Sequence, residues 1–165
     1  MPIMHALLPE LDIEAKTTTR VLERVPGDRL DWTPHPKSSS LGRLAWHIAS
    51  IPATVQRLLR AGVFDLTQAR PAQPPPTDTA AIVEEFHRNF ADTRAYLETL
   101  TDDFLREPFS MVKGEQAVMT IPKAGVVRTI LMNHTYHHRG QLSVYLRLLD
   151  VPVPSIYGST ADEAM

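Results

Sequence analysis

The sequence predicts an all-α fold, a four-helix bundle, and three observations lead to this class. Three segments place apolar residues three and four positions apart over several turns, and a fourth does so nearly as clearly. Only seven glycines stand beside 14 prolines, which argues against a glycine-rich nucleotide-binding fold. The 165 residues are enough to bury a core as one domain over 1–165, with 151–165 forming an extended tail.

The first two expected helices have recognisable ends. Apolar residues spaced by three and four cover 8–25, and Pro26-Gly27 ends that helix. Pro9 either begins the helix in its first turn or bends it. Three consecutive serines, which are good N-cap residues, precede the second helix at 41–62, and a glycine ends it.

The second half of the chain holds two more helices and one irregular stretch. The run PAQPPP at 71–76 predicts an extended linker, and apolar spacing then predicts a helix over 78–100. The period breaks over 102–122, which indicates a small hairpin or an irregular crossover. The longest helix is expected over 123–149. An up-down-up-down bundle is the simplest topology, although the long connections also permit crossovers.

Composition and charge exclude several classes of function. The chain has no cysteine, which excludes disulfides, thiolate nucleophiles and cysteine-containing zinc sites. Its 17 basic and 19 acidic residues give a net charge of −2, so nucleic acid is not an expected partner. No stretch reaches the roughly 18–20 apolar residues of a membrane span, and the first residues do not resemble a signal peptide. We therefore expect a cytoplasmic protein without a membrane partner.

Histidines are the residues that point to chemistry. His134 and His138 lie at i and i+4 on the last expected helix, about 40° apart around the axis, so both imidazoles can reach one ion. His47 lies between Leu44 and Ile48 on the apolar side of the second helix, where we expect it to point inward. Neutral imidazole binds zinc, nickel, copper or iron(II). Either the three histidines hold a metal, or they hydrogen-bond within a helical core.

Four further residues are candidates for the surroundings of this group. His137 is expected to face a neighbouring helix or solvent, in a supporting or hydrogen-bonding role. Gln141, one turn beyond His138, is expected to support the site or to line a pocket. Tyr145 and Tyr157 are expected to contribute to the wall of that pocket.

We expect an acidic pair and the remaining histidines to lie on the surface. Glu10 and Glu14 share one helix face, but nothing in the sequence pairs them with the histidines, which favours a solvated face. His5, His35 and His87 have no partners in the sequence. The motifs of P-loop, dinucleotide-binding, Gly-x-Ser-x-Gly and His-Glu-x-x-His proteins are absent, so no other chemistry is nominated.

Three stretches of the sequence resemble the DinB-like family (damage-inducible, YfiT-type). They are LGRLAWHIASIP in the second helix, RTILMNHTYHHRGQLSVYLRLLDVPVPSIYG in the last helix and beyond, and STADE near the end. The resemblance covers essentially the whole chain. It is specific, because the histidine of the second helix, the His-x-x-x-His pair and the HHRGQ run occur together and in this order.

The resemblance implies a four-helix bundle with long crossover connections, commonly a homodimer, that holds one divalent metal, usually zinc or nickel. Its three histidine ligands correspond to His47, His134 and His138, whereas His137 and Gln141 match the family's run without being ligands. The implied function is that of a metal-dependent hydrolase or of a thiol S-transferase that joins a small-molecule substrate to a low-molecular-weight thiol. The alternative is a non-catalytic stress-response protein that binds a metal or small ligand.

The number and charge of the ligands favour catalysis over a structural role. Three protein ligands leave a coordination position open, as in catalytic metal sites. Because all three are neutral, the ion keeps its charge and lowers the pKa of a bound water or thiol. No acidic residue is placed near the histidines by spacing, so a general base is not identified. This gap favours thiol activation over hydrolysis.

Overall fold

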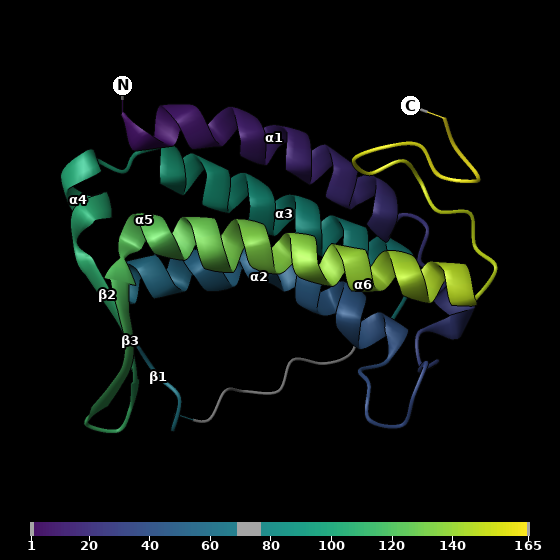
Figure 1. Ribbon diagram of the computed structural model, residues 1–165, viewed down its shortest axis with the longest axis horizontal. Coiled ribbons are helices and arrows are strands. Elements are labelled where there is room, and N and C mark those ends of the chain that lie inside the picture. The colour runs from purple at the N-terminus through teal and green to yellow at the C-terminus, as the bar shows by residue number, and fades with distance from the viewer. Residues whose placement is uncertain (1, 69–76, 165) are drawn as a thin grey trace.

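The computed structural model describes residues 2–68 and 77–164, and helices dominate it (Figure 1). Three long helices pack with a continuous helical run made of three segments. The long helices are α1 (Ile3–Leu22), α2 (Leu41–Ala61) and α3 (Thr79–Glu98), and the run comprises α5 (Lys123–Val126), η2 (Val127–Asn133) and α6 (His134–Leu148). The short elements η1 (Gly27–Arg29) and α4 (Asp102–Arg106) follow α1 and α3. Within the described ranges, none of these helices combines the length and apolarity of a bilayer span.

Capping residues account for the ends of the helices. Ser40 accepts a hydrogen bond from the Arg43 N–H at the start of α2, and Gly62 ends that helix with a φ of 68°. Asp78 caps α3 in the same way as Ser40 caps α2. Helix α1 begins well before Pro9, which therefore lies inside the helix and not at its start. The four predicted helices form, with ends within a few residues of those expected.

The helices pack in a crossed order that brings α2 beside α6. Helix α1 packs on α3 and α6, and α2 also packs on α3 and on the run through η2 and α6, so α1 and α2 lie diagonally. Helices α2 and α3 run in one direction, opposite to α1 and α6 (Figure 1). In agreement, the Ile3 N–H donates to Asp102 just beyond α3. The bundle thus has a crossover topology and not the simplest up-down-up-down order.

A small sheet covers the end of the bundle where α2 ends and α5 begins (Figure 1). Strand β2 (Pro108–Lys113) pairs antiparallel with β3 (Gln116–Pro122). Of the two alternatives expected within 102–122, the hairpin is therefore confirmed over 108–122, whereas 102–106 form the helix α4. Strand β1 (Val63–Asp65), which was not expected, pairs parallel with β2. The Asp65 carboxylate accepts a hydrogen bond from the Gly114 N–H of the hairpin turn, which fixes β1 to the hairpin.

Apolar side chains form two core clusters along the bundle. The cluster nearer the sheet includes Leu59, Phe109 and Met132, and the other includes Leu44 and Leu142. Each fully buried side chain of this size contributes about 1.5–3 kcal/mol. The residues between Met132 and Leu142 include the His-x-x-x-His pair, so the pair follows one cluster and precedes the other along the chain. Packing on both sides therefore fixes the helix that carries it.

The last helical run contains a widened turn directly before His134. Segment η2 is a π-helix of seven residues, and the His134 N–H donates to the carbonyl of Thr129, five residues earlier. A π turn holds one more residue than an α turn, and one residue corresponds to about 100° of rotation. The widened turn therefore sets the direction in which all side chains of α6 point relative to α5.

Two expectations concern the segments outside the helices and strands. The linker predicted at 71–76 lies outside the described residues. The tail beyond α6 contains no helix or strand as far as Ala164. Ion pairs nevertheless hold it against the bundle, Glu163 with Arg20 of α1 and Asp162 with Arg147 of α6.

Candidate metal centre

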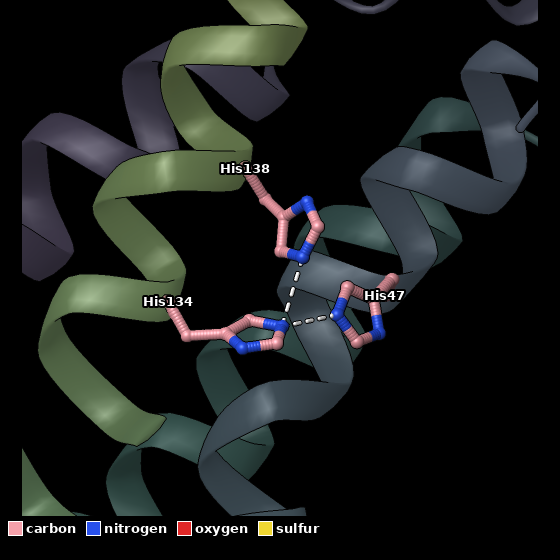
Figure 2. Close-up of side chains that lie close together, drawn as sticks. All are labelled: His47, His134 and His138. Carbon is pink, nitrogen blue, oxygen red and sulfur yellow. Dashed lines mark hydrogen bonds between the residues drawn. The ribbon is translucent and has the colours of Figure 1, made fainter. Parts of the chain in front are cut away.

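Three histidine side chains from two neighbouring helices converge on one point (Figure 2). The Nε2 atom of His134 lies 2.8 Å from Nε2 of His47 and 2.8 Å from Nε2 of His138. One ligand atom from each of the three residues lies within 4.8 Å of the other two. This group is the cluster that could hold a metal ion among the residues the structure describes.

The contacts within the cluster exceed what neutral imidazoles can satisfy by hydrogen bonding. A ring nitrogen of neutral imidazole either donates one hydrogen or offers one lone pair. The Nε2 atom of His134 faces two other Nε2 atoms, so a single proton or lone pair cannot serve both contacts. A cation between the three nitrogens would accept a lone pair from each of them. The donor set therefore fits a metal ion better than a hydrogen-bonded core.

Gln141 orients one of the three rings. Its side-chain carbonyl oxygen lies 2.7 Å from Nδ1 of His138, and because this oxygen only accepts, the Nδ1 of His138 carries the hydrogen. The Nε2 atom that faces His134 is then left with its lone pair free for a metal. A hydrogen bond to the second ring nitrogen is typical of histidines that bind metals. Gln141 thus touches the cluster without facing its centre.

Partial burial keeps two of the rings neutral. Burial lowers the pKa of His134 below its usual value of 6.5, and positive charge on His138 and His137 lowers it further. Burial also lowers the pKa of His138, with His137 acting in the same direction and the hydrogen bond to Gln141 opposing it. Since neutral imidazole is the form that binds metals, both rings are in the binding form at neutral pH.

One expectation about the cluster is wrong: His47 does not point into the core. The side chain of His47 is exposed, whereas His134 and His138 are half-buried. Along α2, Leu44 and Ile48 define the buried face, and His47 lies about 60° and 100° away from them around the axis, at the edge of that face. The side chain of His47 therefore approaches His134 and His138 from the solvent side, which leaves the cluster accessible from outside.

The other candidate residues divide between the cluster and the opposite side of α6. His137 is exposed and its ring centre lies 4.9 Å from that of His138, beside the cluster. Tyr145 lies further along α6, where its hydroxyl donates to the Ser39 carbonyl before α2. Tyr157 is not near the histidines, because its hydroxyl contacts Arg139 on the face of α6 that points to α1. The expected role of Tyr157 in a pocket beside the cluster is therefore wrong.

A buried ion pair between α1 and α6 was not predicted from the sequence. Arg139 is 1% exposed and its guanidinium lies 2.7 Å from the Glu14 carboxylate, whose side chain is 14% exposed. Arg139 also donates to the Thr18 hydroxyl and the Glu14 carbonyl. Earlier in the same helical run, Arg128 of η2 pairs with Glu10 of α1 at 3.0 Å. The expectation of a solvated face is thus wrong for Glu14, whereas the side chain of Glu10 remains 41% exposed. The i, i+4 spacing of the two glutamates was the available signal for a shared helix face.

The surface positions of the remaining histidines are confirmed. His5, His35 and His87 are all exposed. A ring nitrogen of His87 on α3 lies 3.1 Å from the hydroxyl of Thr19 on α1, and neither helix carries a histidine of the cluster. None of the three belongs to the metal-ligand group within the described ranges.

The fold and the site together define a class of protein. It is a helical bundle in which three imidazoles from two adjacent helices converge. The chain belongs to the DinB family, whose model matches residues 4–164. It is 31% identical over 160 residues to the uncharacterized protein YrdA of Bacillus subtilis (strain 168), an alignment that covers 94% of this chain and 89% of YrdA. The family inferred from the sequence motifs is thereby confirmed.

Two solved structures share the fold. A DinB-like protein from Bacillus cereus ATCC 10987 matches with a TM-score of 0.72 and 24% identity over 91% of this chain and 95% of its own. The DinB-like protein YjoA from Bacillus subtilis matches with a TM-score of 0.65 and 20% identity over 88% of this chain and 92% of its own. At these identities the likeness shows the fold alone.

Proposed function

We propose that the chain holds one divalent metal through His47, His134 and His138 and is a metal-dependent enzyme, either a thiol S-transferase or a hydrolase. The observation that carries the proposal is the convergence of three Nε2 atoms that hydrogen bonds among themselves cannot satisfy. With three protein ligands the ion has a coordination position for a substrate. Bound there, a divalent ion lowers the pKa of a water or a thiol enough to make it a nucleophile near neutral pH.

The make-up of the cluster favours thiol transfer over hydrolysis. The group of ligand atoms consists of histidines alone, without a carboxylate that would serve as a general base for water. A thiol needs less help, since its ordinary pKa is already near 8.5 and a metal ligand is deprotonated on binding. We therefore propose a low-molecular-weight thiol as one reactant and a small electrophile as the other. Hydrolysis is the second candidate for the same site.

The identity of the metal is part of the proposal. Imidazole nitrogen suits zinc, nickel, copper and iron, and the open three-histidine arrangement is one that catalytic zinc sites use. We propose zinc or nickel. A cytoplasmic location fits the thiol chemistry, because free thiols stay reduced there. A homodimer is proposed on the resemblance to the family.

The alternative function keeps the metal and lacks turnover. In that case the protein is a stress-response protein that binds a metal or a small ligand at the same three histidines. Protein purified without a histidine tag and loaded with zinc or nickel separates the two. We expect one metal per chain, turnover of a thiol with a panel of electrophiles, and loss of turnover with a chelator. Stoichiometric metal without turnover of thiols or esters would support the binding protein, and absence of metal would overturn both.

Release of the metal by acid is the first testable prediction. Because the pKa of His134 and of His138 is lowered, both rings stay neutral down to a pH below 6.5 and protonate only at lower pH. The metal should stay bound at pH 6.5 and leave only as the pH falls below that value. Metal content after dialysis across this range measures the release. Full retention at about pH 4 in protein that is still folded would argue against histidine ligands.

Without metal, the same shifts predict the pH dependence of stability. A histidine whose pKa is lower in the folded than in the unfolded chain binds fewer protons when folded. The free energy of unfolding of the metal-free protein should therefore decline as the pH falls below 6.5, the value of the unfolded histidine. Urea unfolding at several pH values gives this slope, and His134→Asn should make it shallower.

Gln141 supplies a third prediction. Gln141→Leu keeps the size of the side chain and removes the acceptor for Nδ1 of His138, so this ring is no longer held with Nε2 towards the cluster. We expect metal affinity to fall by about 10-fold to 100-fold, with the fold unchanged. Competition with a chromophoric chelator measures the affinity. Gln56→Leu on α2 is a matched control, and an unchanged affinity of Gln141→Leu would show that the hydrogen bond does not orient the ligand.

A further inference from the structure

The two elements that carry the histidines contain no acidic residue. Neither α2 nor the run from α5 to α6 includes an aspartate or glutamate, over 41–61 and 123–148. They do carry seven basic residues, namely Arg43, Arg57, Arg60, Lys123, Arg128, Arg139 and Arg147. Every Asp, Glu, Lys or Arg side chain on these elements is therefore a cation, and a divalent ion at the histidines would add two further positive charges.

Most of these cations are already engaged by residues of other elements. The four on the last helical run each form an ion pair, with Glu107, Glu10, Glu14 and Asp162 in chain order. On α2, Arg57 donates to a threonine hydroxyl and Arg60 lies over the ring of Tyr96. The guanidinium of Arg43 is exposed and makes no such contact within 2–68 and 77–164. Of the seven, it is the cation available to a ligand.

Arg43 lies beside the histidine cluster. It precedes His47 by four residues, which places it on the same side of α2, about 6 Å along the axis and about 40° around it. Helices α2 and α6 are antiparallel, and two contacts join them on either side of Arg43. One is the 2.8 Å approach of His47 to His134, and the other is the hydrogen bond from Tyr145 to Ser39. Arg43 is exposed and thus lies on the surface of α2 between these two contacts.

We propose that the site selects small anions, with Arg43 as the residue that binds their negatively charged group. The ligand would place one donor atom among the three histidines and a carboxylate within roughly 6 Å of it, the axial distance between His47 and Arg43. Arginine is suited to this role because its planar guanidinium pairs with both oxygens of a carboxylate. The inference rests on the proposed function and names its substrate class, an anionic thiol.

A series of three small thiols tests the proposal. The thiols are 3-mercaptopropionate, 2-mercaptoethanol and cysteamine, which carry a negative, no and a positive charge beside the thiol. Protein loaded with cobalt(II) is titrated with each, and the visible absorption of the bound cobalt reports the apparent Kd. The three thiols differ in their intrinsic pKa, but each thiol has the same intrinsic pKa in the titration of every variant. The change between the wild-type protein and a variant therefore isolates the contribution of the substituted residue.

We expect Arg43→Gln to weaken binding of 3-mercaptopropionate about 10-fold, as for loss of one hydrogen-bonded ion pair, and to leave 2-mercaptoethanol within about 2-fold. Arg43→Lys should retain part of the preference, since the charge remains without the fork of donors. Arg57→Gln is the matched control, because it removes the same charge from the same helix about 15 Å beyond His47. It should change neither affinity.

The outcomes separate this inference from the proposed function. A protein that takes up no cobalt overturns the proposed function. If the protein takes up cobalt but binds thiols of all charges equally, or binds no thiol, only the anion selectivity is overturned. An equal loss for all three thiols in Arg43→Gln would show a structural role of Arg43 and would also overturn it. Loss of the wild-type preference at high salt, with the 2-mercaptoethanol affinity unchanged, would support it.

Discussion

His134→Ala is expected to abolish stoichiometric metal binding. His134 is the central residue of the cluster, since its Nε2 atom lies 2.8 Å from the Nε2 atoms of both other histidines. Without it the two remaining rings offer a pair of ligands from different helices, which holds an ion far more weakly. The loss should exceed the 10-fold to 100-fold range typical of residues that only orient a ligand. Metal analysis of tag-free protein after extensive dialysis measures it.

The matched control for this variant is His87→Ala. It removes a histidine from the exposed surface of α3 and should leave the metal content unchanged. Circular dichroism and thermal unfolding of both metal-free variants establish that the bundle is intact. If His134→Ala retained one ion per chain at wild-type affinity, the assignment of the three ligands would be wrong.

Arg139→Met should destabilise the fold more than any other single substitution of a charged residue considered above. The variant leaves the Glu14 carboxylate, 14% exposed, without its guanidinium partner, and it also removes the donor to Thr18. Breaking one side of a buried ion pair typically costs about 3–5 kcal/mol, because the remaining charge is desolvated and uncompensated. Urea unfolding, with the midpoint and the slope fitted together, measures the difference.

Two further variants give this prediction its control. Arg128→Met breaks the exposed pair between Glu10 of α1 and η2 of the same helical run, and its effect should stay within about 1 kcal/mol. The double variant Glu14→Leu with Arg139→Met removes both buried charges and should recover most of the lost stability. A similar cost for Arg139→Met and Arg128→Met would mean that burial does not determine the contribution of the pair.

Much of the helical structure could be predicted because apolar spacing and capping residues act locally. The stripe of α1, the serine before α2 and the glycine after it each correspond to an observed element or end. The hairpin was predicted as one of two alternatives. Strand β1 was not, because three residues carry too little alternation and their pairing depends on β2, more than 40 residues away along the chain. The helix order could not be read from the residues either, since it depends on packing between whole faces.

The features of the candidate site that depend on helical spacing could be predicted from the sequence, whereas those that depend on burial could not. His134 and His138 come together because i, i+4 positions share a face. His47 was placed with them, but its exposure was predicted wrongly because a position at the edge of an apolar face has no sharp sequence signature. Arg139 was missed for a related reason. A sequence does not distinguish a buried arginine from an exposed one, because the carboxylate that neutralises the buried one is identified only in the folded structure.

The π-helical stretch makes the histidine pair sensitive to insertions and deletions upstream of it. Lys123, paired with Glu107, anchors the start of the helical run, and the stretch at 127–133 separates this anchor from His134. Removing one residue there would turn both histidines by about 100° away from α2, whereas a point substitution leaves their azimuth unchanged. In relatives that lack the extra residue, ligand positions counted from the beginning of this helix would be displaced by one. An alignment must therefore be anchored on the histidines themselves.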